Sequence, residues 1–196
     1  MSRLLSFVLL FAWLPQTTAA QTASDAVNTL QQGIVEILKT VDEGNSNDRF
    51  ERFLELVNAT HDMQTITRLT VHRAWRDLSP ENQNDLVNTV TRLSAATYAS
   101  RFKKYNGQQF SVKQETDSRG GAKLVNAELV LNDGKTIAFD YLLKNTDGTW
   151  LINNILVDGV SDLALKRAEY RDYLATGGYD NLLKELESQI ARASDD

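Results

Sequence analysis

The 196-residue sequence contains no cysteine and only two prolines. Without cysteine the chain can form no disulfide, no thiolate nucleophile and no cysteine metal ligand. Packing alone must therefore hold the fold, and a chain of this length can bury a hydrophobic core without covalent cross-links. We find no internal repeat and no low-complexity linker, so the sequence predicts a single domain after its N-terminal segment.

Recognisable catalytic motifs are also missing. The two histidines, His61 and His72, are eleven residues apart and belong to no metal-binding pattern such as H-E-x-x-H. Neither a G-x-S-x-G nucleophile elbow nor a glycine-rich nucleotide-binding loop is present. We therefore expect no metal, no cofactor and no catalysis. We expect His61 in a solvated loop between two helices, and His72 within a helix, either at its surface or partly buried with a hydrogen bond.

The charge balance is mildly acidic, with 21 lysines and arginines against 26 aspartates and glutamates. Such a chain lacks the basic surface with which proteins bind nucleic acid, and it has no strong attraction to an anionic membrane surface. No exposed heptad or conspicuous apolar patch is legible in the sequence. We expect a monomer with no nucleic-acid partner.

Residues 1–20 have the composition of a signal peptide. Arg3 gives a basic start, residues 4–14 (LLSFVLLFAWL) form an uncharged apolar run, and small residues follow up to Ala20. The run is shorter than the roughly 20 residues that a membrane-spanning helix needs. We expect export and cleavage near Ala20, leaving a mature domain of residues 21–196; the alternative is an uncleaved N-terminal anchor.

Apolar residues recur at three- and four-residue spacing through the first half of the mature chain, which predicts helices. The first begins at a capping Ser24, and Asp62 is positioned to cap a later one. The clearest boundary is Ser79-Pro80, where a capping serine precedes a proline at the first helical position. We expect the helix that begins there to run to about Lys104. Two more helices, separated by Gly177-Gly178, are expected after residue 161.

From residue 110 the apolar period changes from 3.6 to two, which predicts strands. Short turns rich in Asn, Asp and Gly separate four such runs and indicate hairpins. The sequence therefore predicts an α+β fold in which helices cover the apolar face of a four-stranded antiparallel sheet. In the fourth run the alternation breaks at Asn153-Asn154, which indicates a bulge or a strand buried on both faces. The runs are residues 110–117, 122–131, 135–143 and 149–157.

The apolar residues of helices and sheet allow more than one interpretation. They either fill a core, as in a protein-interaction module, or line a cavity, because a pocket lining and a core have the same composition. A third hypothesis is a small enzyme in which an acid projects into a cone-shaped sheet beside a tyrosine. Asp140 and Tyr141 are the candidates, but strand alternation places them on opposite faces, so only one can point inward.

Short segments of the mature chain also match a known pattern, in order along the sequence. They are Asp62 to Arg76, Leu78 to Gln83, Thr97-Tyr98-Ala99, Tyr105, Gly148-Thr149-Trp150, Val157 to Ser161, Arg167, Tyr170 and Gly177 to Leu183. Together they resemble the MlaC/toluene-tolerance family of periplasmic phospholipid-binding proteins. Lys103 to Gly107, and Leu163-Ala164 with Arg167 to Tyr170, are similar to its hopanoid-associated, HpnM-like branch.

The resemblance implies a twisted sheet wrapped by helices, with an apolar cavity for lipid tails between the layers. It implies a soluble periplasmic carrier that shuttles phospholipid between an inner-membrane ABC transporter complex and an outer-membrane partner. A hopanoid or other isoprenoid lipid is the alternative cargo. Two tails with about 30 methylenes would cost roughly 24 kcal/mol to bring bare into water, so the lining must be apolar.

We expect the lipid headgroup to stay near the solvent, without a charged clamp. The candidate lining residues come from both halves of the domain, and each could equally belong to an ordinary core. From the helices they are Ile66, Leu69, Leu86, Val90, Leu93, Tyr98 and Phe102; from the sheet they are Val125, Ala127, Leu129, Ile137, Phe139, Tyr141, Trp150 and Ile152.

The signal peptide gives a direct prediction. The intact mass of the exported protein should lack residues 1–20, because signal peptidase cleaves after the small-residue stretch that ends at Ala20. A mass that still includes Met1 would contradict cleavage and favour the N-terminal anchor.

Overall fold

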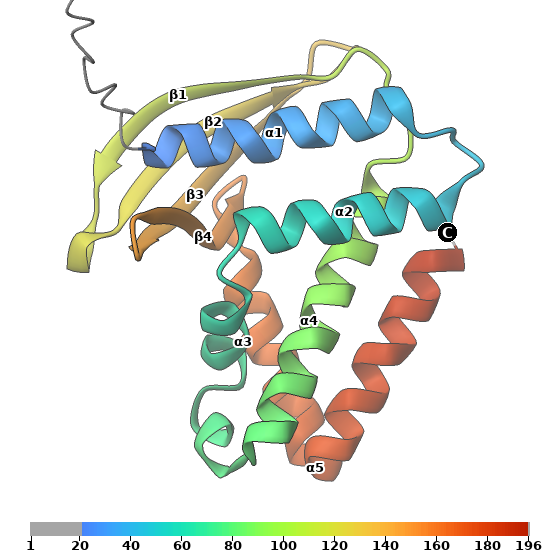
Figure 1. Cartoon of the computed structure of the whole chain (residues 1–196), viewed down its shortest axis with the longest axis vertical. Helices are drawn as coiled ribbons and strands as arrows, with labels where there is room; N and C mark the ends of the chain where they lie inside the picture. The colour runs from blue at the N-terminus through green and yellow to red at the C-terminus, as the bar shows by residue number, and fades with distance from the viewer. Residues whose placement is uncertain (1–20, 196) are drawn as a thin grey trace, which may run out of the picture.

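The structure, a computed structural model, describes residues 21–195, and the predicted signal peptide at residues 1–20 lies outside the described residues. Four helices precede an antiparallel sheet, and a long bent helix follows it (Figure 1). The helices are α1 Ala23–Thr40, α2 Ser46–Thr60, α3 Met63–Val71, α4 Pro80–Arg101 and α5 Asp162–Asp195, with the 3₁₀ segments η1 His72–Asp77 and η2 Arg119–Gly121. The strands are β1 Gln109–Asp117, β2 Lys123–Val130, β3 Thr136–Thr146, β4 Thr149–Val157 and β5 Val160–Ser161.

The sheet is an open antiparallel meander in the order β1-β2-β3-β4-β5. The predicted α+β class is confirmed, but the prediction of four strands is wrong, because β5 pairs with the end of β4. The chain reverses between them through Asp158 and Gly159, both with positive φ. A strand of two residues is too short to show an alternating pattern, which is why the sequence did not predict it.

A β-bulge at Asn153 keeps the apolar face of β4 in register. The pairing with β3 shifts by one residue there, so that Ile152 lies opposite Leu143 and Ile155 lies opposite Tyr141. Side chains alternate along a strand, and an unbroken β4 would turn Ile155 to the other face of the sheet. Of the two alternatives predicted here, a bulge or a strand buried on both faces, the structure has the bulge, which aligns apolar residues on both sides of the break.

Two helix ends differ from the sequence-based expectation. α1 is capped by Thr22 within a capping box, and not by Ser24. Ser24 instead donates hydrogen bonds from its N–H and its hydroxyl to Glu115 on β1, at 2.9 and 2.7 Å, which ties the start of α1 to the sheet. α4 begins at Pro80 behind the capping hydroxyl of Ser79, as predicted, but ends at Arg101.

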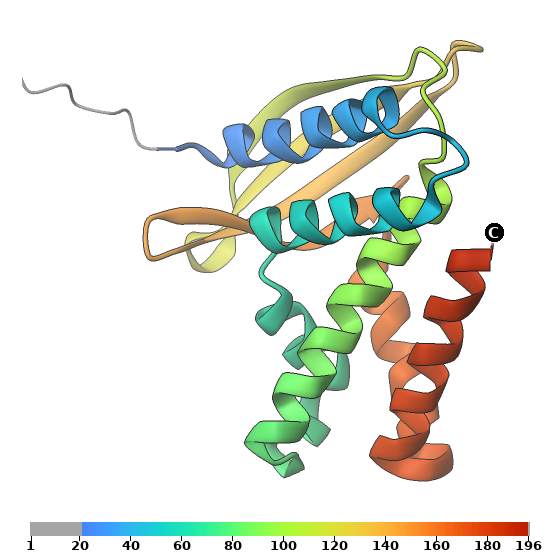
Figure 2. The same cartoon turned by 45° about the vertical axis from the view of Figure 1, so that its right-hand side comes forward.

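The predicted break at Gly177-Gly178 divides α5 into two arms that run back along each other (Figure 2). Gly178 has φ 70° and ψ −157°, a region that only glycine populates readily. A Cβ at Gly177 would lie 2.7 Å from the Cβ of Asn181. Both positions therefore require glycine.

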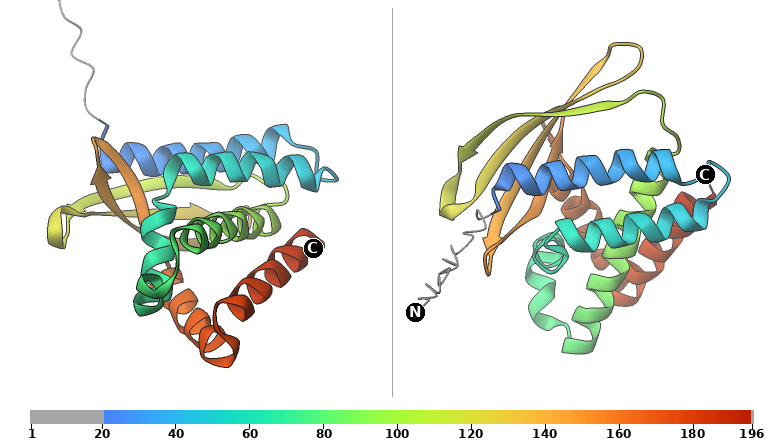
Figure 3. Two further views of the ribbon diagram at one scale, coloured as in Figure 1. Left: turned by 60° about the horizontal axis from the view of Figure 1, so that its bottom comes forward. Right: turned by 45° about the horizontal axis from the view of Figure 1, so that its top comes forward.

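The buried residues form two hydrophobic cores, one between α1 and the sheet and one among the helices α2 to α5. α1 lies across the apolar face of the sheet and packs on all four long strands, as Figures 1 and 3 show. α4 packs on α2 and α5 and forms a second core with Leu86, Val90, Tyr170, Leu182 and Leu186. None of the helices within residues 21–195 is long and apolar enough to cross a membrane.

His61 joins the helical layer to the sheet. It forms a parallel bridge with Ile152, and the neighbouring N–H of Asp62 donates to the Ile152 carbonyl at 2.9 Å. His61 is therefore only 8% exposed, and the prediction of a solvated loop residue is wrong. His72 is exposed, which is one of the two predicted alternatives, but it lies at the junction where α3 ends and η1 begins, with φ 48°.

Burial of His61 makes stability depend on pH. Burial lowers the pKa of His61 from 6.5 to about 4, with a further lowering from the nearby Lys166 ammonium. The unfolded chain therefore takes up a proton before the folded chain does, so stability is full above about pH 6.5 and falls as pH falls toward 4. We expect the free energy of unfolding in urea to fall by about 2 kcal/mol more between pH 7 and pH 5 than in a His61→Gln variant. Equal slopes for the two proteins would contradict the burial of a neutral His61.

Candidate functional site

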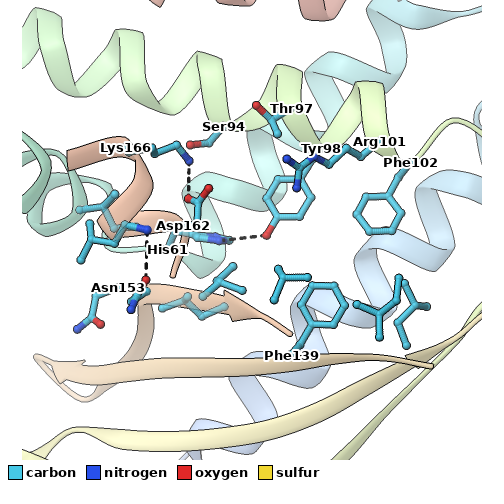
Figure 4. A pocket seen from close by; sticks show the side chains of 18 of the residues that line it. His61, Ser94, Thr97, Tyr98, Arg101, Phe102, Phe139, Asn153, Asp162 and Lys166 are labelled. Atoms are coloured by element: carbon cyan, nitrogen blue, oxygen red, sulfur yellow. Dashed lines mark hydrogen bonds and ion pairs between the residues drawn. The ribbon is translucent and has the colours of Figure 1, made fainter. Parts of the chain in front are cut away.

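A cavity of about 340 Å³ lies between the C-terminal half of α4 and the sheet (Figure 4). It lies between the two hydrophobic cores. On one side α1 covers the adjoining part of the sheet, and on the other α4 packs against α2 and α5. Residues of β2, β3 and β4 form one wall, and α4 forms the opposite wall. Ile66 of α3 and the first turns of α5 complete the lining.

The sheet wall is mostly apolar, and Asn153 and Asn154 of β4 are its polar residues. The bulge at Asn153 turns Ile152 and Ile155 of β4 to the same face as the apolar residues of β2 and β3, and Figure 4 shows Phe139 on the sheet side of the cavity. The apolar residues of this wall are Leu129, Leu131, Ile137, Phe139, Ile152, Ile155 and Val157.

A chain of aromatic rings crosses from the helices to the sheet beside the cavity. Tyr98 and Phe102 of α4 have ring centroids 6.1 Å apart, and Phe102 lies 6.2 Å from Phe110 of β1. Phe110 in turn lies 6.3 Å from Phe139 of β3. Aromatic pairs at these separations add to the stability of a core. These ring contacts therefore link α4 to the sheet at this side of the cavity.

The hydroxyl groups of the α4 wall are used within the helix. Ser94 donates to the Val90 carbonyl at 2.9 Å, and Thr97 donates to the Leu93 carbonyl at 2.8 Å. These hydroxyls therefore have no proton left to donate to a polar ligand, although their oxygens can still accept a hydrogen bond.

The side chains of His61 and Tyr98 also form a hydrogen bond with each other. The Thr60 hydroxyl donates its one proton to the Leu56 carbonyl at 2.6 Å. The 2.9 Å contact between Thr60 Oγ1 and His61 Nδ1 therefore requires Nδ1 to carry a proton. This leaves Nε2 to accept from the Tyr98 hydroxyl at 3.4 Å (Figure 4). Burial raises the pKa of Tyr98 well above its usual value, so it remains a donor.

Charged groups lie at the two ends of the α4 wall. Lys166 of α5 forms a 2.5 Å ion pair with Asp162 (Figure 4). Arg101 is exposed to solvent and also lines the cavity, so it lies at the mouth. Within residues 21–195 no carboxylate lies within ion-pairing distance of its guanidinium.

Seven of the fifteen residues that the sequence suggested as lining border this cavity. They come from the last turns of α4, from α3 and from the apolar face of the sheet. These residues are Ile66, Tyr98, Phe102, Leu129, Ile137, Phe139 and Ile152.

The structure places the other eight elsewhere. Leu86, Val90 and Leu93 belong to a face of α4 that packs into the helical core. Val125, Ala127, Tyr141 and Trp150 pack into the core that includes α1. Leu69 is 36% exposed on α3. The sequence could not separate these groups, because it does not specify which part of the sheet α1 covers or which face of α4 meets α5.

Sequence reasoning missed several lining residues. Ile155 and Val157 were overlooked although the bulge that turns them inward was anticipated. Arg101 and Lys166 carried no signal in the sequence, because isolated basic residues on helices are usually solvated. His61 was missed because its burial depends on pairing with Ile152, 91 residues away in the chain.

The acid–base hypothesis finds no support in the placement of Asp140. Its carboxylate accepts a 2.6 Å hydrogen bond from Asn126 on the face of the sheet opposite Phe139 and Tyr141, and it does not line the cavity. His61, with a pKa of about 4, is a weak base at neutral pH. No group of three potential metal ligands is found among residues 21–195. What the site offers chemically is an apolar binding surface with a cationic mouth.

Comparison with known proteins identifies relatives of this chain and of its fold. The chain is 26% identical over 178 residues to the toluene tolerance protein ttg2D of Pseudomonas putida, a match that covers 88% of this chain and 82% of the relative. The fold is similar to that of a phospholipid-binding protein from Ralstonia solanacearum, solved in complex with a phospholipid. That match has a TM-score of 0.76 at 19% identity and covers 89% of this chain and 99% of the other. The MlaC protein family model matches residues 28–188, which is most of the sequence, and the chain therefore belongs to the MlaC family.

Proposed function

We propose that this protein is a periplasmic carrier that holds phospholipid tails in the cavity between α4 and the sheet. The observation that carries the proposal is a cavity with an apolar sheet wall, in which the hydroxyl and imidazole groups are satisfied by the protein itself. A lipid tail offers no hydrogen bond, so a wall whose polar groups already have partners suits it.

The energetics favour binding without catalysis. Each methylene moved out of water contributes about 0.8 kcal/mol, so affinity depends on the apolar surface covered. The cavity of about 340 Å³ is near the lower end of the roughly 300–1,000 Å³ range of ligand pockets. We propose that it widens when both tails enter, through rearrangement of the partly buried side chains of its lining, such as Phe102, Phe139 and Ile155.

The proposed route runs between an inner-membrane ABC transporter complex and an outer-membrane partner complex, with the protein acting as a monomer after removal of its signal peptide. Membership of the MlaC family supports this proposal. A carrier must also release its cargo and leave each membrane. The net charge of −5 over the whole sequence disfavours tight adhesion to anionic lipid.

Membership of the hopanoid-associated branch stays a prediction, which rests on Lys103 to Gly107, Leu163-Ala164 and Arg167 to Tyr170. The two cargoes differ in shape, since two acyl tails need a flexible, forked space and a hopanoid needs a flat, undivided one. Chemical identification of bound lipid distinguishes them directly.

Two serines on α4 allow a matched test of where the tails bind. Ser94 lines the cavity, whereas Ser100 lines a separate groove formed by α2, α4 and the end of α5. Both are half-buried, and both hydroxyls donate to a carbonyl of α4. A Ser94→Trp substitution should fill the cavity and lower the affinity for a fluorescent phospholipid at least tenfold, the loss of roughly 1.4 kcal/mol or more.

The matched Ser100→Trp variant should bind the fluorescent phospholipid like the unaltered protein. Circular dichroism and urea unfolding of both variants separate a blocked cavity from a damaged fold. Equal affinities for the two variants, with both folded, would show that the tails bind somewhere else.

A further inference from the structure

The charged groups that line the cavity do not balance. Lys166 is neutralised by Asp162 at 2.5 Å, and its side chain is only 17% exposed. His61 is neutral at physiological pH, because burial lowers its pKa to about 4. Arg101 is the remaining charged residue of the lining. The cavity therefore carries one uncompensated positive charge in a protein whose net charge is −5.

Arg101 lies where the apolar wall meets solvent. It is the last residue of α4, and it follows Tyr98 by one helical turn on the side that faces the cavity (Figure 4). The partial negative charge at the C-terminal end of a helix stabilises a cation at this place but does not neutralise it. A ligand whose tails lie against Phe102 and Phe139 would bring a group at its polar end close to this guanidinium.

On this basis we propose that Arg101 binds the phosphodiester group of the lipid and makes the cavity selective for phosphate-bearing lipids over neutral ones. The proposal rests on the proposed function, since it assigns a headgroup site to the same cavity. It differs from the sequence-based expectation of a headgroup without a charged clamp. A guanidinium presents its N–H donors in a planar fork that matches two phosphate oxygens, so Arg is suited to this contact.

The ion pair at the other end explains why the phosphate would favour Arg101. Asp162 holds the Lys166 ammonium and its carboxylate repels a second anion. A phosphate at that end would have to compete with this carboxylate. At Arg101 it meets no competitor among residues 21–195. This difference between Lys166, which is paired, and Arg101, which has no carboxylate partner among residues 21–195, orients the lipid, with its headgroup at the C-terminal end of α4.

The test compares two lipids with identical acyl chains, phosphatidylglycerol and diacylglycerol, which differ in the phosphate-containing headgroup. Each displaces a fluorescent lipid from the mature protein. We expect phosphatidylglycerol to bind about tenfold more tightly than diacylglycerol. This is the gain in affinity expected from one charge-assisted hydrogen bond between Arg101 and the phosphate. The preference should shrink as salt is added, because an exposed charge is screened.

Arg101→Gln should remove this preference by weakening phosphatidylglycerol binding to the level of diacylglycerol. Arg101→Lys, which keeps the charge and loses the fork, should retain part of it. Arg119→Gln is the matched control, since Arg119 is also exposed and without a carboxylate partner within residues 21–195 but lies in the β1–β2 connection, away from the cavity. This variant should keep the full preference.

The outcomes separate the headgroup site from the carrier function. An unchanged preference in Arg101→Gln would overturn the role of Arg101 while tail binding stands. Failure of both lipids to bind the unaltered protein would overturn the carrier proposal as well. Inorganic phosphate, tested as a competitor, should displace neither lipid at the concentrations at which the lipids compete. Displacement by phosphate alone would show a free-anion site and contradict the lipid headgroup assignment.

Discussion

The apolar face of the sheet is larger than the helix that covers it, and the rest of the structure follows from this mismatch. α1 lies across one part of the face and completes a core with the strands. Beyond α1 the same face continues through Leu129, Ile137 and Val157, opposite the C-terminal half of α4, a helix that also packs on α2 and α5. Because α4 obtains its packing from α2 and α5, it need not collapse onto the sheet. The uncovered part of the face becomes a cavity.

Two local features, a β-bulge and a β-bridge, set the register of the cavity wall and the position of the helices on the sheet. The bulge at Asn153 directs Ile152 and Ile155 to the same side of β4, so the wall remains apolar along its length. The bridge between His61 and Ile152 fixes where the helical layer meets the sheet. At that junction His61 is buried as a neutral base between Thr60 and Tyr98, and its two ring nitrogens are paired with their hydroxyl groups. Such a wall is compatible with hydrocarbon.

The sequence predicted the parts of this fold that depend on local chemistry. The start of α4 at Ser79-Pro80, the hairpins and the bulge at Asn153 all follow from residue types at fixed spacing. The parts that depend on contacts between distant segments were not predictable in the same way. Tyr98 lines the cavity and Leu86 lies in the helical core, although both are apolar residues of α4. His61 was placed in solvent because nothing near it in the sequence indicates a partner on β4.

Native mass spectrometry of the mature protein, purified from its host's periplasm without added lipid, tests the carrier account most directly. The account predicts one lipid per protein, and extraction of that lipid should give a two-tailed molecule with a phosphate headgroup. If the extracted lipid is a hopanoid, the protein is still a lipid carrier, but its cargo is not a phospholipid. A protein that is free of lipid, and that binds none when phospholipid vesicles are supplied, would contradict the account.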